Sequence, residues 1–171
     1  TPPDFWAHCL EVAAHMLLVA DKVATVDEGK EIITAVRDNG AGWEKFREMV
    51  QAQGGKVAEV DDPSLLPQAR MVEPIRAQRT GFIAAIDTGA VGLACTHLGA
   101  GREKKGDPVD SAVGLMMPVK IGDKIQAGET ICWVHANDDR RLQEATTAVR
   151  QAIQFTADPV LPHKHFHGTI Q

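Results

Sequence analysis

Apolar residues in the first third of the chain recur at spacings of three and four, which is the period of an α-helix. The first such run starts after Asp4, which follows two prolines and is predicted to be the N-cap of the helix. The apolar positions of this run are so numerous that we expect the helix to be buried on much of its circumference. A capping-box pattern at Thr25–Glu28 predicts the start of a second helix, and Asn39–Gly40 predicts its end. A third helix is predicted from about Trp43 to Gly54–Gly55.

Beyond the polar, proline-bearing segment at residues 61–67, the apolar period falls towards two, which indicates short strands. Strands are predicted around Ile75 and over Phe82–Ile86, on either side of a turn at Thr80–Gly81. Frequent glycines over residues 89–128 predict further short strands and tight turns.

Residues 121–134 are predicted to form a compact strand–turn–strand unit. One last helix is predicted from Asp138 to about Phe155, with its apolar residues on one face, and the tail from Pro159 to Gln171 is expected to be extended. We place a boundary near residue 72, between a helical part and an α+β part, so the predicted fold class is α+β.

Composition narrows the classes of protein that the chain can be. Its 171 residues suffice for one domain or two small ones. With 18 Lys and Arg against 23 Asp and Glu, the net charge of −5 disfavours nucleic-acid binding. No apolar run approaches the ~20 residues of a membrane helix, so no membrane partner is expected. Cys9, Cys95 and Cys132 form no C-x-x-C pair, which argues against a disulfide framework or zinc ribbon and favours the reducing cytoplasm.

The segment Leu98–Gly106 (LGAGREKKG) is the most enzyme-like stretch of the chain. Its glycines would let backbone amides approach a phosphate, and Arg102, Lys104 and Lys105 would neutralise its charge. Neither a Walker pattern nor a complete G-x-G-x-x-G is present. We favour a structural interpretation, in which the glycines form a tight turn and the lysines are solvated.

Two groups of histidines were considered as metal ligands. His163, His165 and His167 alternate, so an extended strand would project all three to one face. No carboxylate or cysteine near them in the sequence completes a ligand set, and a native metal site is not expected. His8, Glu11 and His15 lie along one side of the first predicted helix, where a structural role is the stronger interpretation.

The segment Val119–Ile131 resembles the G-D-x-V-x-x-G-x-x-L segment of biotinyl and lipoyl carrier domains. Those domains present a lysine at a hairpin tip shortly downstream, because the cofactor needs an exposed amine. The residues that follow here, Trp133–Asp139, contain no lysine. Carrier function is therefore not expected, although the resemblance suggests a β fold of the barrel-sandwich kind.

Taken in order, several segments of the chain resemble the carboxy-terminal part of pyrimidine-nucleoside phosphorylases. The resemblance covers nearly the whole chain, and its motifs are specific as a set although each alone is weak. Members that accept both uridine and thymidine are the best match, with thymidine phosphorylase next. The segments that carry the resemblance are Pro3–Asp4, Leu10, His15–Met16, Gln53–Gly55, Val60–Asp62, Leu98–Arg102, Asp107–Gly114, Ile121–Asp123, Gly128–Glu129 and Leu161–Ile170.

The resemblance implies reversible phosphorolysis, in which phosphate attacks C1′ of a pyrimidine nucleoside and releases the base and a pentose 1-phosphate. It also implies that the glycine-rich phosphate loop, the base-reading residues and the dimer-forming helical domain lie upstream of Thr1. We therefore carry no catalytic, substrate-binding or metal-binding residue onto this chain and expect no cofactor. The chain by itself is expected to be inactive.

On the same resemblance, residues 1–72 would be the last helices of a large α/β domain. Residues 73–171 would be the C-terminal α+β domain, with a barrel-sandwich or hammerhead-like β core. The full-length enzyme is expected to be a cytoplasmic homodimer that binds phosphate and a pyrimidine nucleoside. The competing hypothesis is a non-catalytic ligand-binding or carrier-like scaffold domain.

Overall fold

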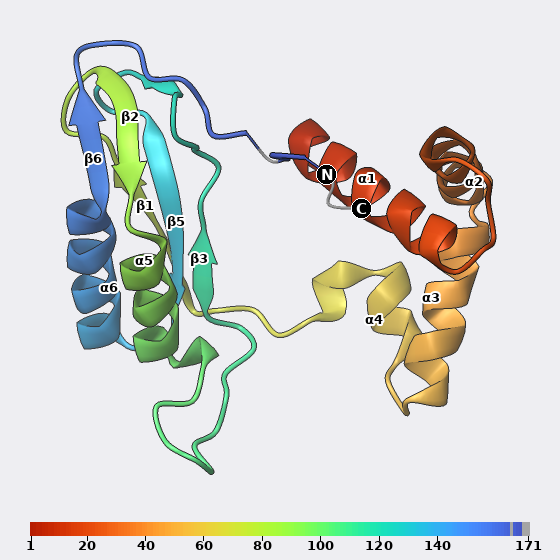
Figure 1. Ribbon diagram of the computed structural model, residues 1–171. Coiled ribbons are helices and arrows are strands. Elements are labelled where there is room, and N and C mark those ends of the chain that lie inside the picture. Colours follow the sequence, from red (N-terminus) through yellow and green to blue (C-terminus); the bar gives the residue numbers. More distant parts are fainter. Residues whose placement is uncertain (165, 169–171) are drawn as a thin grey trace. The chain divides into compact units, whose positions relative to one another are not determined.

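The computed structural model describes residues 1–164 and 166–168. The chain divides into two compact units, Thr1–Leu65 and Leu66–Gln171, and each is described by itself (Figure 1). This division lies a few residues before the boundary that the sequence predicts near residue 72. The mixture of helices with two small antiparallel sheets confirms the predicted α+β class.

The first unit consists of helices, and the three that were predicted are confirmed. The prediction that Asp4 is the first N-cap is wrong. Pro2 is the N-cap, and Asp4 lies in the first turn. Pro3 is favoured as the first helical residue, because the backbone N–H that it lacks would have no partner within the helix at that position. The elements of this unit are α1 (Pro3–Val19), α2 (Val26–Asp38), α3 (Ala41–Ala52), the short α4 (Val57–Asp61) and a 3₁₀ turn (Pro63–Leu65).

The capping box that opens α2 is confirmed. The backbone N–H of Glu28 donates to the hydroxyl of Thr25 at 3.1 Å, and the Glu28 carboxylate accepts from the backbone N–H of Ala24 at 2.8 Å. At the other end of the helix, Gly40 has φ +81°, as the predicted helix end requires.

Helices α1 and α2 pack through a close approach at Gly29. Ala14 is fully buried there, and a Cβ built on Gly29 would lie 3.1 Å from both Cα and Cβ of Ala14. One neighbouring helix covers only one stripe of α1, so the expected burial on much of its circumference is wrong. Among the described residues of α1 only Ala14 is buried, whereas Phe5 and Met16 are 58% and 67% exposed.

The second unit contains two three-stranded antiparallel sheets. The first has the order β1–β5–β3 and the second has the order β4–β2–β6. The strands predicted on either side of Thr80–Gly81 are present, but consecutive β1 and β2 belong to different sheets, as do β4 and β5. The strands are β1 (Met71–Arg76), β2 (Gly81–Ile86), β3 (Gly114–Met116), β4 (Lys124–Ile125), β5 (Thr130–Ala136) and β6 (Ile153–Thr156).

Two helices of this unit depart from the sequence prediction. Residues 89–100 were expected to form strands and turns, but they contain α5 (Thr88–Cys95) and a π-helical turn (Thr96–Ala100). The Asp87 carboxylate caps α5 by accepting from the Ala90 N–H at 2.9 Å, and this cap outweighs the low helix propensity of the glycines.

The last helix, α6 (Asp139–Ala152), has the predicted N-cap Asp138 but ends earlier than predicted. Ile153 pairs with Ile86 and the following residues continue along β2, so pairing with the sheet takes over from the helix. Phe155 consequently lies in β6 rather than in the helix.

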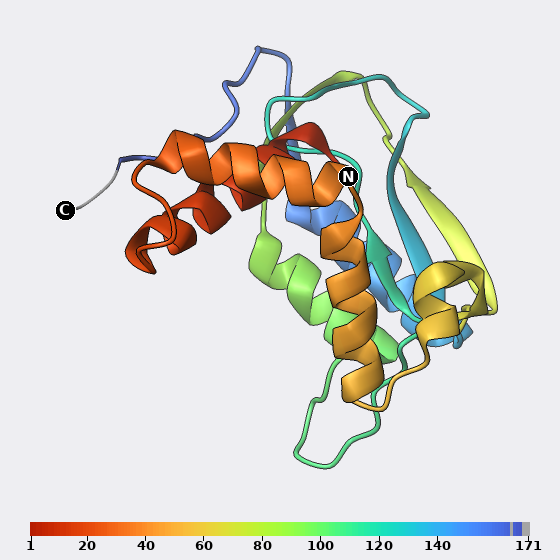
Figure 2. The ribbon, with the colours of Figure 1, turned by 90° about the vertical axis from the view of Figure 1, so that its right-hand side faces the viewer.

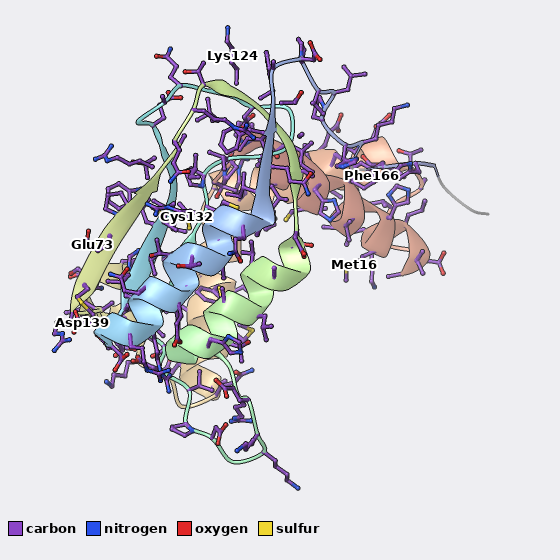
Figure 3. All side chains as sticks on the ribbon, turned by 90° about the vertical axis from the view of Figure 1, so that its left-hand side faces the viewer. Met16, Glu73, Lys124, Cys132, Asp139 and Phe166 are labelled. Atoms are coloured by element: carbon purple, nitrogen blue, oxygen red, sulfur yellow. The ribbon has the colours of Figure 1, made fainter. Side chains whose placement is uncertain are left out.

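The core of the second unit gathers around β5, which is the central strand of its sheet. Cys132, Val134 and Ala136 are fully buried on β5, and α6 contributes a buried stripe that includes Leu142 and Val149. Helices α5 and α6 lie side by side in Figures 1 and 3. Burial, with a smaller contribution from the nearby Cys95 thiol, raises the pKa of Cys132 to about 11.

Three turns of one design shape the second unit, and we call them the glycine–acid turns: residues 104–107, 120–123 and 126–129. In each, the third residue is a glycine with φ between +90° and +96°. The carboxylate of the fourth residue accepts from the backbone N–H of the first, at 2.8, 2.8 and 2.5 Å. The left-handed glycine is the requirement of a type II turn.

Gly122 and Gly128 provide a matched pair of substitutions in two of these turns. Alanine at either position must adopt a left-handed conformation, at a cost of about 1–2 kcal/mol. Only at Gly122 would the new Cβ also meet the tail, at 2.9 Å from the carbonyl oxygen of Val160, whereas nothing lies within 4 Å at Gly128. We predict that Gly122→Ala lowers the free energy of unfolding, measured in urea, by more than Gly128→Ala does. Equal losses would contradict the packing of the tail against this turn.

The exposed apolar face of α1 predicts self-association of the chain. Phe5 is exposed and Leu10 is half-buried, and contiguous apolar patches on a surface tend to find partners. We expect the chain to associate or aggregate at high concentration, and Phe5→Lys with Leu10→Lys to reduce this in light scattering. Leu161→Lys, at an exposed apolar residue of the tail, is the control that should have no effect. A monodisperse, concentration-independent monomer would contradict the prediction.

Candidate functional site

The glycine-rich segment Leu98–Gly106 lies where α5 ends. Its first part forms the π-helical turn, within which Gly99 has φ +111°. The carbonyl of Gly99 accepts from the N–H of Asp110 at 2.9 Å, which closes the loop that follows. The guanidinium of Arg141, on α6, lies 3.2 Å from the position that a Cβ of Gly99 would occupy. The glycine therefore lets the end of α5 approach α6 closely.

A pocket of about 550 Å³ opens beside this turn, between the loop and the start of α6. In Figure 2 the loop that forms one wall extends beyond the end of α5. Asp139, labelled in Figure 3, marks the start of α6. The polar side chains that line the pocket are Asp110, Asn137, Asp138 and Arg141.

Hydrogen bonds hold the acidic wall of the pocket in place. Asp110 accepts from the N–H of Ala112 at 3.0 Å and from the side-chain amide of Asn137 at 2.8 Å. These two bonds, with the backbone bond first, hold the pKa of Asp110 below its usual range. The oxygen of the Asn137 amide accepts in turn from the N–H of Arg70 at 2.7 Å. The network ties the loop to the strand–helix junction after β5.

Asp138 adds a second ionised carboxylate to the wall. It accepts from the backbone N–H of Arg141 at 2.9 Å, and this bond is the main reason that its pKa is lowered. Arg141 is the only cation among the residues that line the pocket. Two fixed carboxylates facing one guanidinium make an environment that repels a phosphate dianion.

The cations of the glycine-rich segment are not part of the pocket. Arg102, Lys104 and Lys105 are exposed, and none of them lines it. Lys104 and Asp107 instead form the ends of a glycine–acid turn. The exposed lysines agree with the structural interpretation of this segment, which stays a prediction.

Neither histidine group forms a metal site in the part of the chain that is described. No cluster of three or more His, Cys, Asp or Glu side chains there could hold a metal ion. His163 and His167 lie in the irregular tail, and His165 lies outside the described residues. Because the set of His163, His165 and His167 lies partly outside the described residues, the expectation of no metal site there stays a prediction.

Glu11 and His15 have structural partners, as the sequence analysis favoured. Glu11 forms an ion pair with Lys30 of α2 at 2.5 Å, and the hydrogen bond from Lys30 lowers the pKa of this carboxyl. Nδ1 of His15 lies within hydrogen-bond distance, 2.9 Å, of the backbone carbonyl of Glu11. The ion pair joins α1 to α2, and the His15 contact lies within α1, so both side chains have structural partners.

The carrier-like segment Val119–Ile131 contains two of the glycine–acid turns. Strand β5 begins directly after them and runs as a buried central strand to Ala136. A carrier domain would present its lysine on an exposed hairpin tip shortly after such a segment. The carrier alternative is therefore not favoured.

Sequence reasoning missed the network of Asp110, Asn137 and Arg70. These residues are far apart in the chain, and no motif contains all three. The one available signal was the Asn137–Asp138 pair at the junction between a predicted strand and a predicted helix. Such polar pairs cap helices often, so the pair alone could not indicate a pocket.

Comparison with known proteins shows which family the second unit resembles. Residues 82–156, which contain the two helices and most of the strands just described, match the family described as pyrimidine nucleoside phosphorylase C-terminal domain. The pyrimidine-nucleoside phosphorylase of Geobacillus stearothermophilus is 33% identical over 159 residues, and that of Bacillus subtilis is 36% identical over 169 residues. These alignments cover 93% and 99% of this chain.

The second unit therefore contains a phosphorylase C-terminal domain. The chain is similar to pyrimidine-nucleoside phosphorylases along nearly its whole length, in agreement with the resemblance in its sequence. It spans 36% and 39% of the lengths of the Geobacillus and Bacillus relatives. Among the described residues, no helix is both long and apolar enough to cross a membrane.

Two variants distinguish a structural from a ligand-binding role of the glycine-rich segment. A Cβ at Gly101 would lie 2.9 Å from Oγ1 and 3.3 Å from Cγ2 of Thr96, whose hydroxyl donates to the Gly92 carbonyl. We predict that Gly101→Val destabilises the chain by about 1 kcal/mol or more and lowers its melting temperature.

The matched variant, Lys104→Ala with Lys105→Ala, removes two exposed charges and should leave the melting temperature almost unchanged. Thermal unfolding followed by circular dichroism measures both effects. If the lysine pair instead abolished binding of phosphate or a nucleotide, the segment would be a ligand site.

Proposed function

We propose that this chain is the C-terminal part of an enzyme that catalyses the reversible phosphorolysis of pyrimidine nucleosides. In this reaction phosphate attacks C1′ of the nucleoside, the glycosidic bond breaks, and the products are the free base and ribose 1-phosphate or deoxyribose 1-phosphate. The enzyme is then a pentosyl transferase, and a place in nucleoside salvage follows from its products. The observation that carries the proposal is the match of residues 82–156 to the phosphorylase C-terminal domain. The alignment with the Bacillus relative extends this similarity along nearly the whole chain.

In this proposal the helices of the first unit complete a larger α/β domain of the enzyme. We assign residues 1–72 to the last helices of a larger α/β domain and residues 73–171 to the C-terminal domain that flanks its cleft. The exposed apolar side chains of α1 and α3, among them Phe5, Met16 and Trp43, are consistent with helices that pack against further protein. The whole enzyme is proposed to be a cytoplasmic homodimer.

The described part of the chain contributes no catalytic residue to this reaction. Departure of the base gives the sugar oxocarbenium character, so catalysis depends on positioning the nucleoside and on cations around the phosphate. The pocket beside Gly99 has two ionised carboxylates and one guanidinium, so it does not surround a phosphate with cations. We therefore assign the phosphate and nucleoside ligands to other parts of the enzyme.

The reading frame upstream of Thr1 tests the proposal directly. A glycine-rich phosphate loop with a Lys-Ser or Lys-Thr pair is expected there, and the protein that includes it should release uracil or thymine only when phosphate is present. An unrelated upstream domain, or a longer protein without phosphate-dependent release of base, would overturn the proposal.

We predict that the 171-residue chain alone shows no phosphorolysis of uridine or thymidine. Positioning supplies most of the catalysis in such a reaction, and the groups that would supply it are not in this chain. Chromatographic measurement of free base, with a complete pyrimidine-nucleoside phosphorylase as positive control and a buffer blank, gives the result. Phosphate-dependent release of base above the blank would mean that the site lies within residues 1–171.

A further inference from the structure

A second pocket of the C-terminal unit lies apart from the glycine-rich segment and shares no lining residue with the pocket beside it. Its volume is about 180 Å³. One wall is the β1–β2 connection, and the other is the junction where α6 passes into β6, visible in Figure 1. Its charged lining residues are three arginines, Arg76, Arg79 and Arg150.

Two of these arginines are held in place by backbone carbonyls. Arg76 donates to the carbonyl of Gly128 at 3.0 Å, and Arg79 donates to the carbonyl of Phe155 at 3.2 Å. The guanidinium of Arg79 also lies over the ring of Phe155, 5.7 Å from its centroid. A guanidinium has five N–H donors, so each of these contacts leaves several available for another acceptor.

Among the residues that the structure describes, the three charges have no acidic partner. Within residues 1–164 and 166–168, none of the three forms an ion pair, whereas Arg37, Arg47, Arg70 and Arg140 each lie within 4.0 Å of a carboxylate. The nearby carboxylate of Glu129 is engaged by the N–H of Gln126 in its glycine–acid turn. No lining residue of the pocket is acidic.

Arg76, Arg79 and Arg150 are exposed, so water weakens the repulsion between their charges, and an anion bound among them would offset what remains. The chain as a whole carries a net charge of −5, so this concentration of positive charge does not follow from composition. Arginine is the side chain best suited to phosphate, because its planar fork donates two parallel hydrogen bonds. Gln78 adds a neutral donor to the same pocket.

We propose that this pocket binds a phosphate group, either as inorganic phosphate or as the monoester of a small sugar. Its volume lies below the ~300–1,000 Å³ of pockets that take drug-sized ligands, so the ligand must be small. Ile131, Ile153 and Phe155 form an apolar side of the pocket against which the carbon skeleton of a sugar phosphate would lie.

Isothermal titration calorimetry on the 171-residue chain tests the proposal with inorganic phosphate, ribose 5-phosphate and ribose. We expect saturable binding of one phosphate per chain and no binding of ribose. Tighter binding of ribose 5-phosphate would identify the sugar monoester as the better ligand, and equal binding would identify the phosphate group alone; both results support the site. Absence of saturable binding by both phosphates, or equal binding of ribose, would overturn it.

Arginine variants locate the site. Arg150 is exposed and has no hydrogen bond or ion pair within the described chain, so Arg150→Gln should fold normally and bind phosphate about tenfold or more weakly. Arg79→Gln should weaken binding similarly. Arg140→Gln, on the same helix but paired with Glu144, is the matched control and should bind within about twofold of the original chain. Equal losses in Arg140→Gln and Arg150→Gln would overturn the assignment.

The protonation of the ligand supplies an independent readout. The second pKa of a phosphate monoester is about 6, so binding of ribose 5-phosphate should weaken as the pH falls through this value, because the dianion is lost. Sulfate keeps both charges and should bind without this loss, since the arginines stay protonated. A parallel loss of sulfate binding over the same pH range would show that the protein, and not the ligand, changes charge, and would overturn the proposed recognition of a dianion.

Discussion

The burial of β5 is the constraint on which the C-terminal unit depends. Cys132 and Val134 have no exposed surface, and the strand pairs with β1 on one edge and β3 on the other. Such a strand needs the apolar stripe of helix α6 packed against it. It also needs a defined turn before its first residue and a defined connection after its last. A glycine–acid turn lies at its start, and Asn137 and Asp138 follow its end. The pocket beside Gly99 borders the end of β5, and the arginine pocket borders its start.

Local chemistry determined which parts of the fold the sequence could predict. Helix α2 and the start of α6 were found because Thr25 and Asp138 are capping residues with their partners a few positions away. Helix α5 was missed because two of its eight residues are glycines, which favour turns, and only the Asp87 cap reveals its start. The early end of α6 depends on pairing between Ile153 and Ile86, which are distant in sequence.

The same distinction applies to the candidate sites. The segment Leu98–Gly106 drew attention because glycines and cations stand together, yet its lysines belong to a turn that recurs twice where no phosphate was suspected. The arginine pocket left no local signal. Arg79 and Arg150 are brought together only by pairing of β2 with β6, so no motif in one stretch of the chain could have indicated it. The resemblance to pyrimidine-nucleoside phosphorylases located neither pocket.

Strand β1 has a consequence for how the domain behaves in a crowded solution. It is the edge of its sheet, and it includes Pro74 between charged Glu73 and Arg76. A proline has no N–H to offer to an incoming strand, and charges on an edge make its desolvation costly. Fibril growth by addition of one copy's strand to another is therefore hindered at this border. The sheet that buries apolar residues on its central strand β5 therefore has an edge strand, β1, that resists pairing with another copy of the chain.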